Sequence, residues 1–374
     1  MKGYYLFAPM EPENLGPHSG VERKVRAQHK SLNEYVDCEL VIMPAAEYSG
    51  SISEKIIRRL PFTAAWRKWE YKGEFDDADF LYMRQVYHDD SFARYLRSIK
   101  KSNPKIKIIY ELPTYPFDDV NHKKLTVSQK IFAQKSMHAK KDIAKCIDRI
   151  VTFYGQNEIW GVSCIDLMNG YDFSKVQLPK REKSDAVHIM SVSATAFWHG
   201  YDRVIEGIHE YYENGGTENI VYHLVGNILP EHQKAVENYG LQEHVIFYGR
   251  MSGEPLKEVF EKNFMGIDVL GGHRKQYPVS SSLKSREYAA YGMPVITSSP
   301  IDYLPEDYEY QFIAPYDDSP LDMKAVLEFY HGIYDNNDCY GIAKEIREYA
   351  VSRCDMSIAM KPVADWILEK EENT

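Results

Sequence analysis

The sequence lacks the features that mark several specialised classes of protein. None of its apolar runs is long enough to span a bilayer as a helix, and the first residues have neither the apolar core nor the cleavage site of a signal peptide. The five cysteines are scattered and form no C-x-x-C pair, which argues against a disulfide framework and against a zinc site. We therefore expect a globular protein of the reducing cytoplasm.

Positive charge is scarce in the second half of the chain. Residues 1–180 carry 28 Lys and Arg against 23 Asp and Glu, whereas residues 181–374 carry 17 against 32. A mildly basic half joined to a strongly acidic half predicts two domains with different partners. We expect no nucleic-acid partner.

The hydrophobic pattern predicts two doubly wound, Rossmann-like α/β domains that face each other across a cleft. In each half, short apolar runs alternate with amphipathic stretches of helical length, which is typical of βαβ units and a parallel sheet. A polar run at residues 180–185 separates the halves. We expect an N-terminal domain at 1–180, a C-terminal domain at 181–355, and a helix at 356–374 that packs back on the first domain.

Ligands of doubly wound sheets bind beyond the carboxyl ends of the strands, so the loops that follow strands are informative. Ser19 and Gly20 open a helix, where small residues let backbone N–H groups approach an anion; a merely flexible loop is the alternative. His199 and Gly200 follow another predicted strand. This histidine is a candidate donor to a phosphate oxygen, or else a capping or packing residue.

Glu111 ends a third predicted strand, with two prolines close behind it in the sequence. A carboxylate at this position is able to accept a hydroxyl proton in catalysis or to hold a sugar hydroxyl. The alternative is an acid that caps a helix or braces a loop. We name Glu111 as the candidate catalytic residue.

The stretch SSSLKSREYAAYGMPVITSS, residues 280–299, places small hydroxyl residues at a helix start. Backbone N–H groups, the helix dipole and Lys284 suit an anion at Ser282-Leu283-Lys284. Glu287, one turn inside, suits a ribose diol instead, because a carboxylate accepts two hydroxyl hydrogen bonds. A diphosphate beside a ribose indicates a nucleoside diphosphate. The alternative is a solvated, salt-bridged helix start.

Together these segments resemble the retaining glycosyltransferases of the GT-B fold, in the large bacterial family that includes mannosyl-, glucosyl- and galactosyltransferases of lipopolysaccharide and capsule synthesis. The resemblance covers essentially the whole chain. The family's Glu-x7-Glu segment ends in a ribose-holding glutamate followed by Ala-x-Gly-x-Pro-Val-Ile, and residues 287–296 match it. Its diphosphate-contacting loop is matched by His18–Arg23. Its Gly-Arg pair near the base is matched by Gly249-Arg250-Met251.

The chain departs from the family pattern at the contacts to the donor sugar. Val279 stands at the position of the first glutamate, and Ala194 replaces an arginine. His199 replaces the lysine of a Lys-Gly pair, and Glu111 stands where the family has a catalytic histidine. Arg274, in a Gly-Gly-His-Arg segment, is a candidate to replace some of these contacts.

The resemblance implies a metal-independent hexosyltransferase that moves a sugar, with retention, from a nucleotide-diphosphate sugar to a glycan or polyprenyl-linked acceptor in surface polysaccharide synthesis. The nucleotide sugar is a co-substrate, and no other cofactor is expected. Two alternatives stay open. An epimerase on the same fold would need an extra acid/base pair in the cleft. A catalytically silent partner subunit would keep the nucleotide pocket but not the activity. A Rossmann dehydrogenase is disfavoured, because no G-x-G-x-x-G follows a predicted strand.

Two basic segments predict a peripheral contact with an anionic inner leaflet. Residues 55–69 interleave arginines and lysines with Leu60, Phe62, Trp66 and Trp69, and residues 123–141 carry a second lysine-rich cluster. Basic residues between aromatic ones suit the membrane interface. A core helix with a solvated basic face is the alternative.

Overall fold

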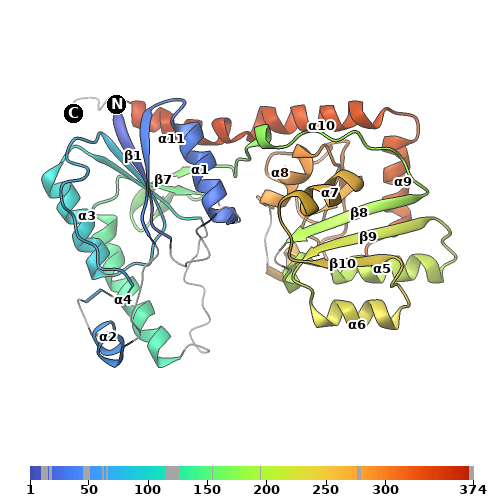
Figure 1. Cartoon of the computed structure of the whole chain (residues 1–374), viewed down its shortest axis with the longest axis horizontal. Coiled ribbons are helices and arrows are strands. Elements are labelled where there is room, and N and C mark those ends of the chain that lie inside the picture. The colour runs from blue at the N-terminus through green and yellow to red at the C-terminus, as the bar shows by residue number, and fades with distance from the viewer. Residues whose placement is uncertain are drawn as a thin grey trace. The chain divides into compact units, whose positions relative to one another are not determined.

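The computed structural model describes residues 1–9, 16, 19–44, 51–60, 63–64, 66–113, 126–153, 155–193, 195–275 and 279–369. The chain divides into two compact units (Figure 1). The first comprises Met1–Leu167 together with the segment from Ala359, and the second comprises Met168–Ile358. The division falls before the polar run at 180, because Phe173 and Val176 are buried in the core of the second unit.

The first unit is built on a seven-stranded sheet in the order β2-β1-β3-β4-β5-β7-β6, parallel except for the pair β6–β7. Figure 1 shows α3 and α4 on one side of this sheet and α1 on the other. The strands are β1 Lys2–Phe7, β2 Asp37–Ile42, β3 Phe80–Arg84, β4 Lys107–Glu111, β5 Arg149–Thr152, β6 Glu158–Ile159 and β7 Val162–Asp166; the helices are α1 Gly20–Leu32, α2 Ile52–Ile57, α3 Asp90–Ser102 and α4 Val127–Ala144.

Polar residues fix where the helices of the first unit begin. Ser19 caps α1 by accepting a hydrogen bond from the Glu22 N–H, and Thr126 forms a capping box with Gln129 at the start of α4. Helix α11, Met356–Leu368, enters the first unit at Ala359. There Lys107 Nζ donates to the carbonyl oxygens of residues 366 and 367, at 3.2 and 3.0 Å.

The second unit contains a six-stranded, all-parallel sheet in the order β10-β9-β8-β11-β12-β13. In Figure 1, α5 and α6 cover one face, and α7 and α8 cover the other. The strands are β8 Ala186–Ser193, β9 Asn219–Gly226, β10 Val245–Gly249, β11 Met265–Ile267, β12 Val295–Thr297 and β13 Gln311–Ile313; the helices are α5 Asp202–Glu213, α6 Pro230–Asn238, α7 Glu254–Lys262, α8 Leu283–Ala290, α9 Met323–Tyr334 and α10 Cys339–Cys354, with short 3-10 turns η3 Phe173–Lys175, η4 Phe197–His199 and η5 Gly272–Lys275.

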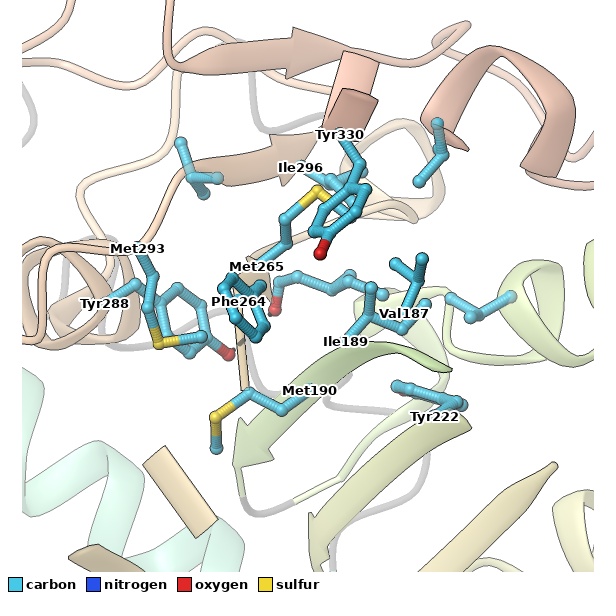
Figure 2. Packing of buried hydrophobic residues seen from close by; sticks show 14 of the residues in the cluster. Val187, Ile189, Met190, Tyr222, Phe264, Met265, Tyr288, Met293, Ile296 and Tyr330 are labelled. Atoms are coloured by element: carbon cyan, nitrogen blue, oxygen red, sulfur yellow. Dashed lines mark hydrogen bonds between the residues drawn. The ribbon is translucent and has the colours of Figure 1, made fainter. Parts of the chain in front are cut away.

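The core of the second unit sets the position of α8 (Figure 2). Tyr288 of α8 is fully buried, and its hydroxyl donates to the Ile267 carbonyl at 2.9 Å. A Cβ atom at Gly266 would lie 2.2 Å from the Tyr288 ring, so a glycine is required for this close approach. Burial of a large side chain contributes about 1.5–3 kcal/mol. The aromatic ring therefore holds α8 against β11.

The predicted fold class, two doubly wound parallel-sheet α/β domains, is confirmed. The hydrophobic pattern predicts strands at residues 4–8, 80–83, 106–110 and 187–192, and these lie within two residues of β1, β3, β4 and β8. Strands β6, β7 and β13 and helix α2 were not predicted. These elements are short, and β6 and β13 have only two and three residues.

Candidate functional site

The carboxyl ends of the parallel strands of the second unit bring four loops to one edge of the sheet. Ser193 ends β8, Asp268 follows β11, and Arg250 follows β10. Arg250 Nε donates to the Asn227 side-chain oxygen, which joins the loops after β10 and β9. Met251 lies beside Arg250 and is half-buried. Arg250 and Met251, which the sequence motif predicts near the base of the nucleotide, thus lie at this edge.

Asp268, directly after β11, holds the loop before α8 through hydrogen bonds. Its carboxylate is fully buried and accepts hydrogen bonds from the hydroxyls of Ser280, at 2.7 Å, and Ser282. Lys284 Nζ lies 3.6 Å from Oδ1 and donates to the Asp268 carbonyl at 2.9 Å. Sequence analysis missed this residue, although a lone carboxylate after the apolar run Met265–Ile267 was a usable signal.

The start of α8 has the features of an anion-binding helix terminus. Ser282 is its N-cap and accepts from the Ser285 N–H at 3.2 Å, while Leu283 at the first position is exposed. Burial alone would lower the pKa of Lys284, but Tyr201 and Asp268 raise it, so the ammonium group stays charged. N–H groups at a helix start together with a cation favour a negatively charged ligand.

Arg286 and Glu287, next on α8, differ in role. Arg286 is fully buried and donates to the carbonyl oxygens of Asn169, at 2.9 Å, and Ser282, at 3.0 Å, as well as to Asp302. It therefore braces the loop. Glu287 is half-buried and lies one turn after Lys284, on the same side of the helix. Its role towards a ribose stays a prediction.

Gly200 brings the loop after β8 against the loop after β11. It has φ of 70°, and a Cβ atom there would lie 2.6 Å from the Gly271 nitrogen, so both conformation and space require glycine. His199 precedes it in η4, and its Nδ1 accepts from the Ala196 N–H at 3.2 Å. Burial and, secondly, Lys284 lower the pKa of His199 to about 3, so its imidazole is neutral.

Arg274 forms a clamp between loops. It donates to both oxygens of Asp202, at 2.9 and 2.7 Å, to Asp318 at 2.7 Å and to the Phe197 carbonyl at 2.7 Å. These bonds, first the one to Asp202, raise its pKa. Four of its five N–H groups therefore form hydrogen bonds inside the unit. The predicted contact of Arg274 with the donor sugar stays a prediction.

Thr195 is a polar residue that the sequence analysis did not select. It is buried in the loop after β8, and its Oγ1 has no hydrogen-bond partner among the described residues. A buried hydroxyl normally finds a partner, since leaving it unpaired costs about 1–3 kcal/mol. A ligand at this edge is a fitting partner for it.

In the first unit, Ser19 and Gly20 form the start of α1 as expected. The Glu22 carboxylate accepts from the Gly16 N–H at 2.6 Å, and this bond, followed by Arg26, lowers its pKa. A Cβ atom at Gly20 would meet nothing within 4 Å, so packing among the described residues does not require a glycine there. An anion-binding role for these two residues stays a prediction.

Glu111 is at the end of β4 but has no exposed surface. Its carboxylate accepts hydrogen bonds from Tyr82 OH at 2.6 Å and Gln28 Nε2 at 2.8 Å, and it pairs with Arg84. Burial would raise its pKa, but Arg84 and Lys24 lower it below the ordinary value. An ionised carboxylate with three partners is typical of a bracing residue, so the geometry favours that alternative over the catalytic role.

Other possible sites are distinct from this edge. Two cavities of the second unit, of about 540 and 710 Å³, are lined by Phe329, Ile333 and Ile342 and by Glu218 and Leu327, respectively. Neither includes a residue of the strand-end loops described above. Among the described residues, no group of three or more His, Cys, Asp or Glu is arranged to hold a metal ion. No described helix is both long and apolar enough to cross a membrane.

The chain is similar to known proteins in its fold, whereas its sequence matches no protein-family model and no curated protein. Solved structures match over almost the whole chain. A glycosyltransferase from Rickettsia africae has a TM-score of 0.62 at 11% identity, covering 99% of each chain. HepE of Anabaena in complex with UDP has a TM-score of 0.58 at 12% identity, covering 98% of this chain and 99% of that one.

A third match is WaaG, a glycosyltransferase involved in lipopolysaccharide biosynthesis, with a TM-score of 0.57 at 13% identity over 98% of this chain and 100% of that one. The chain has the GT-B fold. Identities this low establish the fold alone, because one fold supports many activities and function depends on the residues of the site.

Proposed function

We propose that the protein is a glycosyltransferase that takes its sugar from a nucleotide-diphosphate sugar. The observation that carries this proposal is the loop at Ser280–Lys284, which Asp268 holds at the carboxyl edge of the sheet. His199 and Gly200 contact the chain that follows Asp268. HepE, which shares the fold, was crystallised with UDP and with UDP-glucose, and this supports the assignment of an anionic nucleotide.

The site residues suit the departure of a nucleoside diphosphate. Amides at the start of α8, the Lys284 ammonium and the imidazole N–H of His199 would stabilise the charge that develops on the leaving group. Glu287 would hold the ribose, and Arg250 and Met251 would lie near the base. Donors aimed at this charge act without a metal ion, and the sequence motifs favour retention at the anomeric carbon.

We further infer a glycan or polyprenyl-linked acceptor in surface polysaccharide synthesis. Support comes from the motif resemblance and from the shared fold with WaaG. The test is incubation of the protein with a panel of nucleotide sugars, with and without lipid-linked glycans, while released nucleoside diphosphate is measured. Sugar interconversion without an acceptor would indicate an epimerase, and absence of any turnover would indicate a silent subunit.

A contact with an anionic membrane is supported by α2 in the first unit. Ile52, Ile56 and Ile57 are 78, 56 and 53% exposed, and no residue of α2 is buried. Lys55 is exposed on the same short helix, and Arg59 is exposed two residues after its end. Exposed aliphatic residues beside cations suit the boundary between headgroups and acyl chains.

Two aromatic residues of this segment, Trp66 and Trp69, pack within the first unit, and Phe62 lies outside the described residues. Trp69 is buried in the core against Phe92, with ring centroids 5.0 Å apart, and Trp66 stacks on Tyr87 at 4.0 Å. Both rings anchor the segment to the first unit, and the buried indole of Trp69 is not available to lipid. The isoleucines are therefore the candidate membrane-facing side chains.

Helix α2 is held in place by a buried lysine of α4. Lys135 Nζ donates to the carbonyl oxygens of Arg58 at 2.9 Å and Leu60 at 2.8 Å, and to Thr63 Oγ1 at 3.0 Å. Flotation with anionic vesicles at low salt tests the contact. We expect Ile56→Asp to reduce flotation and Ile358→Asp, at an exposed isoleucine of α11, to leave it unchanged. Equal flotation of both variants would contradict the assignment.

A further inference from the structure

A continuous chain of hydrogen bonds connects Lys284 to His199 in the second unit. Lys284 Nζ donates to Tyr201 OH at 3.2 Å, and Tyr201 OH donates to Ser193 Oγ at 3.1 Å. Ser193 Oγ lies 3.1 Å from His199 Nδ1. An ammonium group only donates, and each hydroxyl has one proton to pass on. The direction is therefore set from Lys284 to Ser193, whereas the direction of the last bond depends on which nitrogen of His199 carries the proton.

The same nitrogen of His199 accepts a hydrogen bond from the main chain. The Ala196 main-chain N–H donates to Nδ1 at 3.2 Å. A nitrogen that accepts from an N–H group carries no proton, so the single proton of the neutral ring lies on Nε2. The Ser193 hydroxyl therefore donates to Nδ1. His199 thus has a defined tautomer, assigned from its hydrogen-bond partners.

We propose that Tyr201 and Ser193 are positioning residues that transmit the charge of Lys284 to His199 and keep its Nε2–H as a neutral donor for the diphosphate of the substrate. This inference rests on the proposed function. Hydrogen bonds in a chain polarise one another, so each donor in the series is strengthened by the one before it. The arrangement would provide part of the positive field at the diphosphate with an imidazole that carries no charge.

The charged groups around His199 favour this neutral form. Lys284 of α8 and Lys275 of η5 disfavour an imidazolium ion, whereas Asp268 after β11 favours it. Burial is the largest of the effects that lower the pKa of His199, to about 3. A neutral imidazole with a fixed tautomer binds an anion equally well across the range, about pH 5–8, in which an unperturbed histidine changes its charge.

The first experiment is ¹⁵N NMR of the full-length protein labelled at histidine, with His199 assigned by its absence in His199→Gln. We expect the chemical shifts of a ring protonated only at Nε2, without titration between pH 8 and 5. Tyr201→Phe interrupts the chain and should shift the His199 ¹⁵N signals. Tyr211→Phe, in the helix α5 that Tyr201 precedes but with its hydroxyl accepting from the Glu218 N–H, should not shift them.

The second experiment is calorimetric titration with UDP-glucose and with GDP-mannose. These diphosphate diesters are suitable probes because they do not titrate near neutral pH, whereas the terminal phosphate of free UDP does. We expect Tyr201→Phe and Ser193→Ala to weaken binding about three- to tenfold, the usual range for a lost hydrogen bond. The affinity of the wild-type protein for both probes should stay constant between about pH 5.5 and 8, where an unperturbed histidine would change its charge.

The outcomes separate the inference from the proposed function. A proton on Nδ1, titration of His199 in this pH range, or unchanged affinity in both variants would overturn the positioning role. If the wild-type protein bound neither probe, the proposed function and the ligand assigned to His199 would fail together. The NMR signature would still report whether the chain of hydrogen bonds orients the imidazole.

Discussion

Asp268 and Lys284 form an ion pair in the second unit in which the carboxylate side chain has no exposed surface and the lysine side chain is 13% exposed. The pair joins the end of β11 to the first turn of α8. Because both groups are withdrawn from water, the cost of desolvation offsets much of their attraction, and such a pair contributes to the definition of a geometry more than to net stability. We infer that this pair defines the loop Ser280–Lys284.

Replacement of Asp268 by Asn should damage both this loop and nucleotide binding. The amide is uncharged, so Lys284 loses its partner, and the amide NH₂ cannot accept the second serine hydrogen bond. We expect the free energy of unfolding to fall by about 1–3 kcal/mol and UDP affinity to fall with it. Denaturant unfolding and calorimetry measure these effects. Asp317→Asn, at an exposed position, is the control, and equal behaviour of the two variants would exclude the organising role.

Gly200→Ala should destabilise the second unit through two separate effects. The residue has φ of 70°, which costs a non-glycine residue about 1–3 kcal/mol. The new Cβ would also lie 2.6 Å from the Gly271 nitrogen. Gly240→Ala is a matched control, because φ is +67° there and nothing lies within 4 Å. Thermal unfolding should show a larger loss for Gly200→Ala, and an equal loss would mean that the contact with Gly271 is unimportant.

Glu287→Ala should weaken nucleotide binding by about 1–3 kcal/mol, because it removes charge-assisted hydrogen bonds to the ribose. The free energy of unfolding should change little. Calorimetric titration with UDP and with its 2′-deoxy analogue measures the effect, and the variant should lose its preference for the ribose. Glu348→Ala, an exposed glutamate of α10, serves as control. A variant that still discriminates the two sugars would show that Glu287 does not hold the ribose.

Glu111→Gln should affect stability more than turnover. The change leaves the buried Arg84 guanidinium without its partner, and breaking such a pair costs about 3–5 kcal/mol. Denaturant unfolding at pH 7 measures this loss, and turnover per folded molecule should be close to that of the wild-type protein. A large drop in turnover at unchanged stability would restore the catalytic role that the sequence predicted.

The effect of Glu111 should depend on pH in a defined direction. Its pKa in the folded unit lies below the ordinary value of 4.5, because Arg84 and Lys24 outweigh burial. The stabilisation is therefore fully present above pH 4.5 and is lost as the pH falls through the lower folded-state pKa. The difference in unfolding free energy between the wild-type protein and Glu111→Gln should shrink on acidification. A difference that grows would contradict this assignment.

The order of strands and helices was accessible from the sequence. Strands such as Phe80–Arg84 and Lys107–Glu111 are buried on both faces of a parallel sheet, so they appear as short apolar runs between amphipathic helices. The positions of Ser282 and Gly200 at loops after strands followed from the same pattern. Pattern and turn chemistry are local properties, and a local property can be recognised along the chain.

The partners of the site residues were decided by tertiary structure. Asp268 is twelve residues from Ser280, and Glu111 is 83 residues from Gln28, so no local pattern relates them. Whether a carboxylate at the end of a strand faces a ligand or a buried arginine depends on which side chains the neighbouring strands and helices bring to it. Sequence alone determined the α/β fold and the loops that end its strands. Packing determined which polar groups pair with one another inside each unit, because a buried charge must find its partners on neighbouring strands and helices.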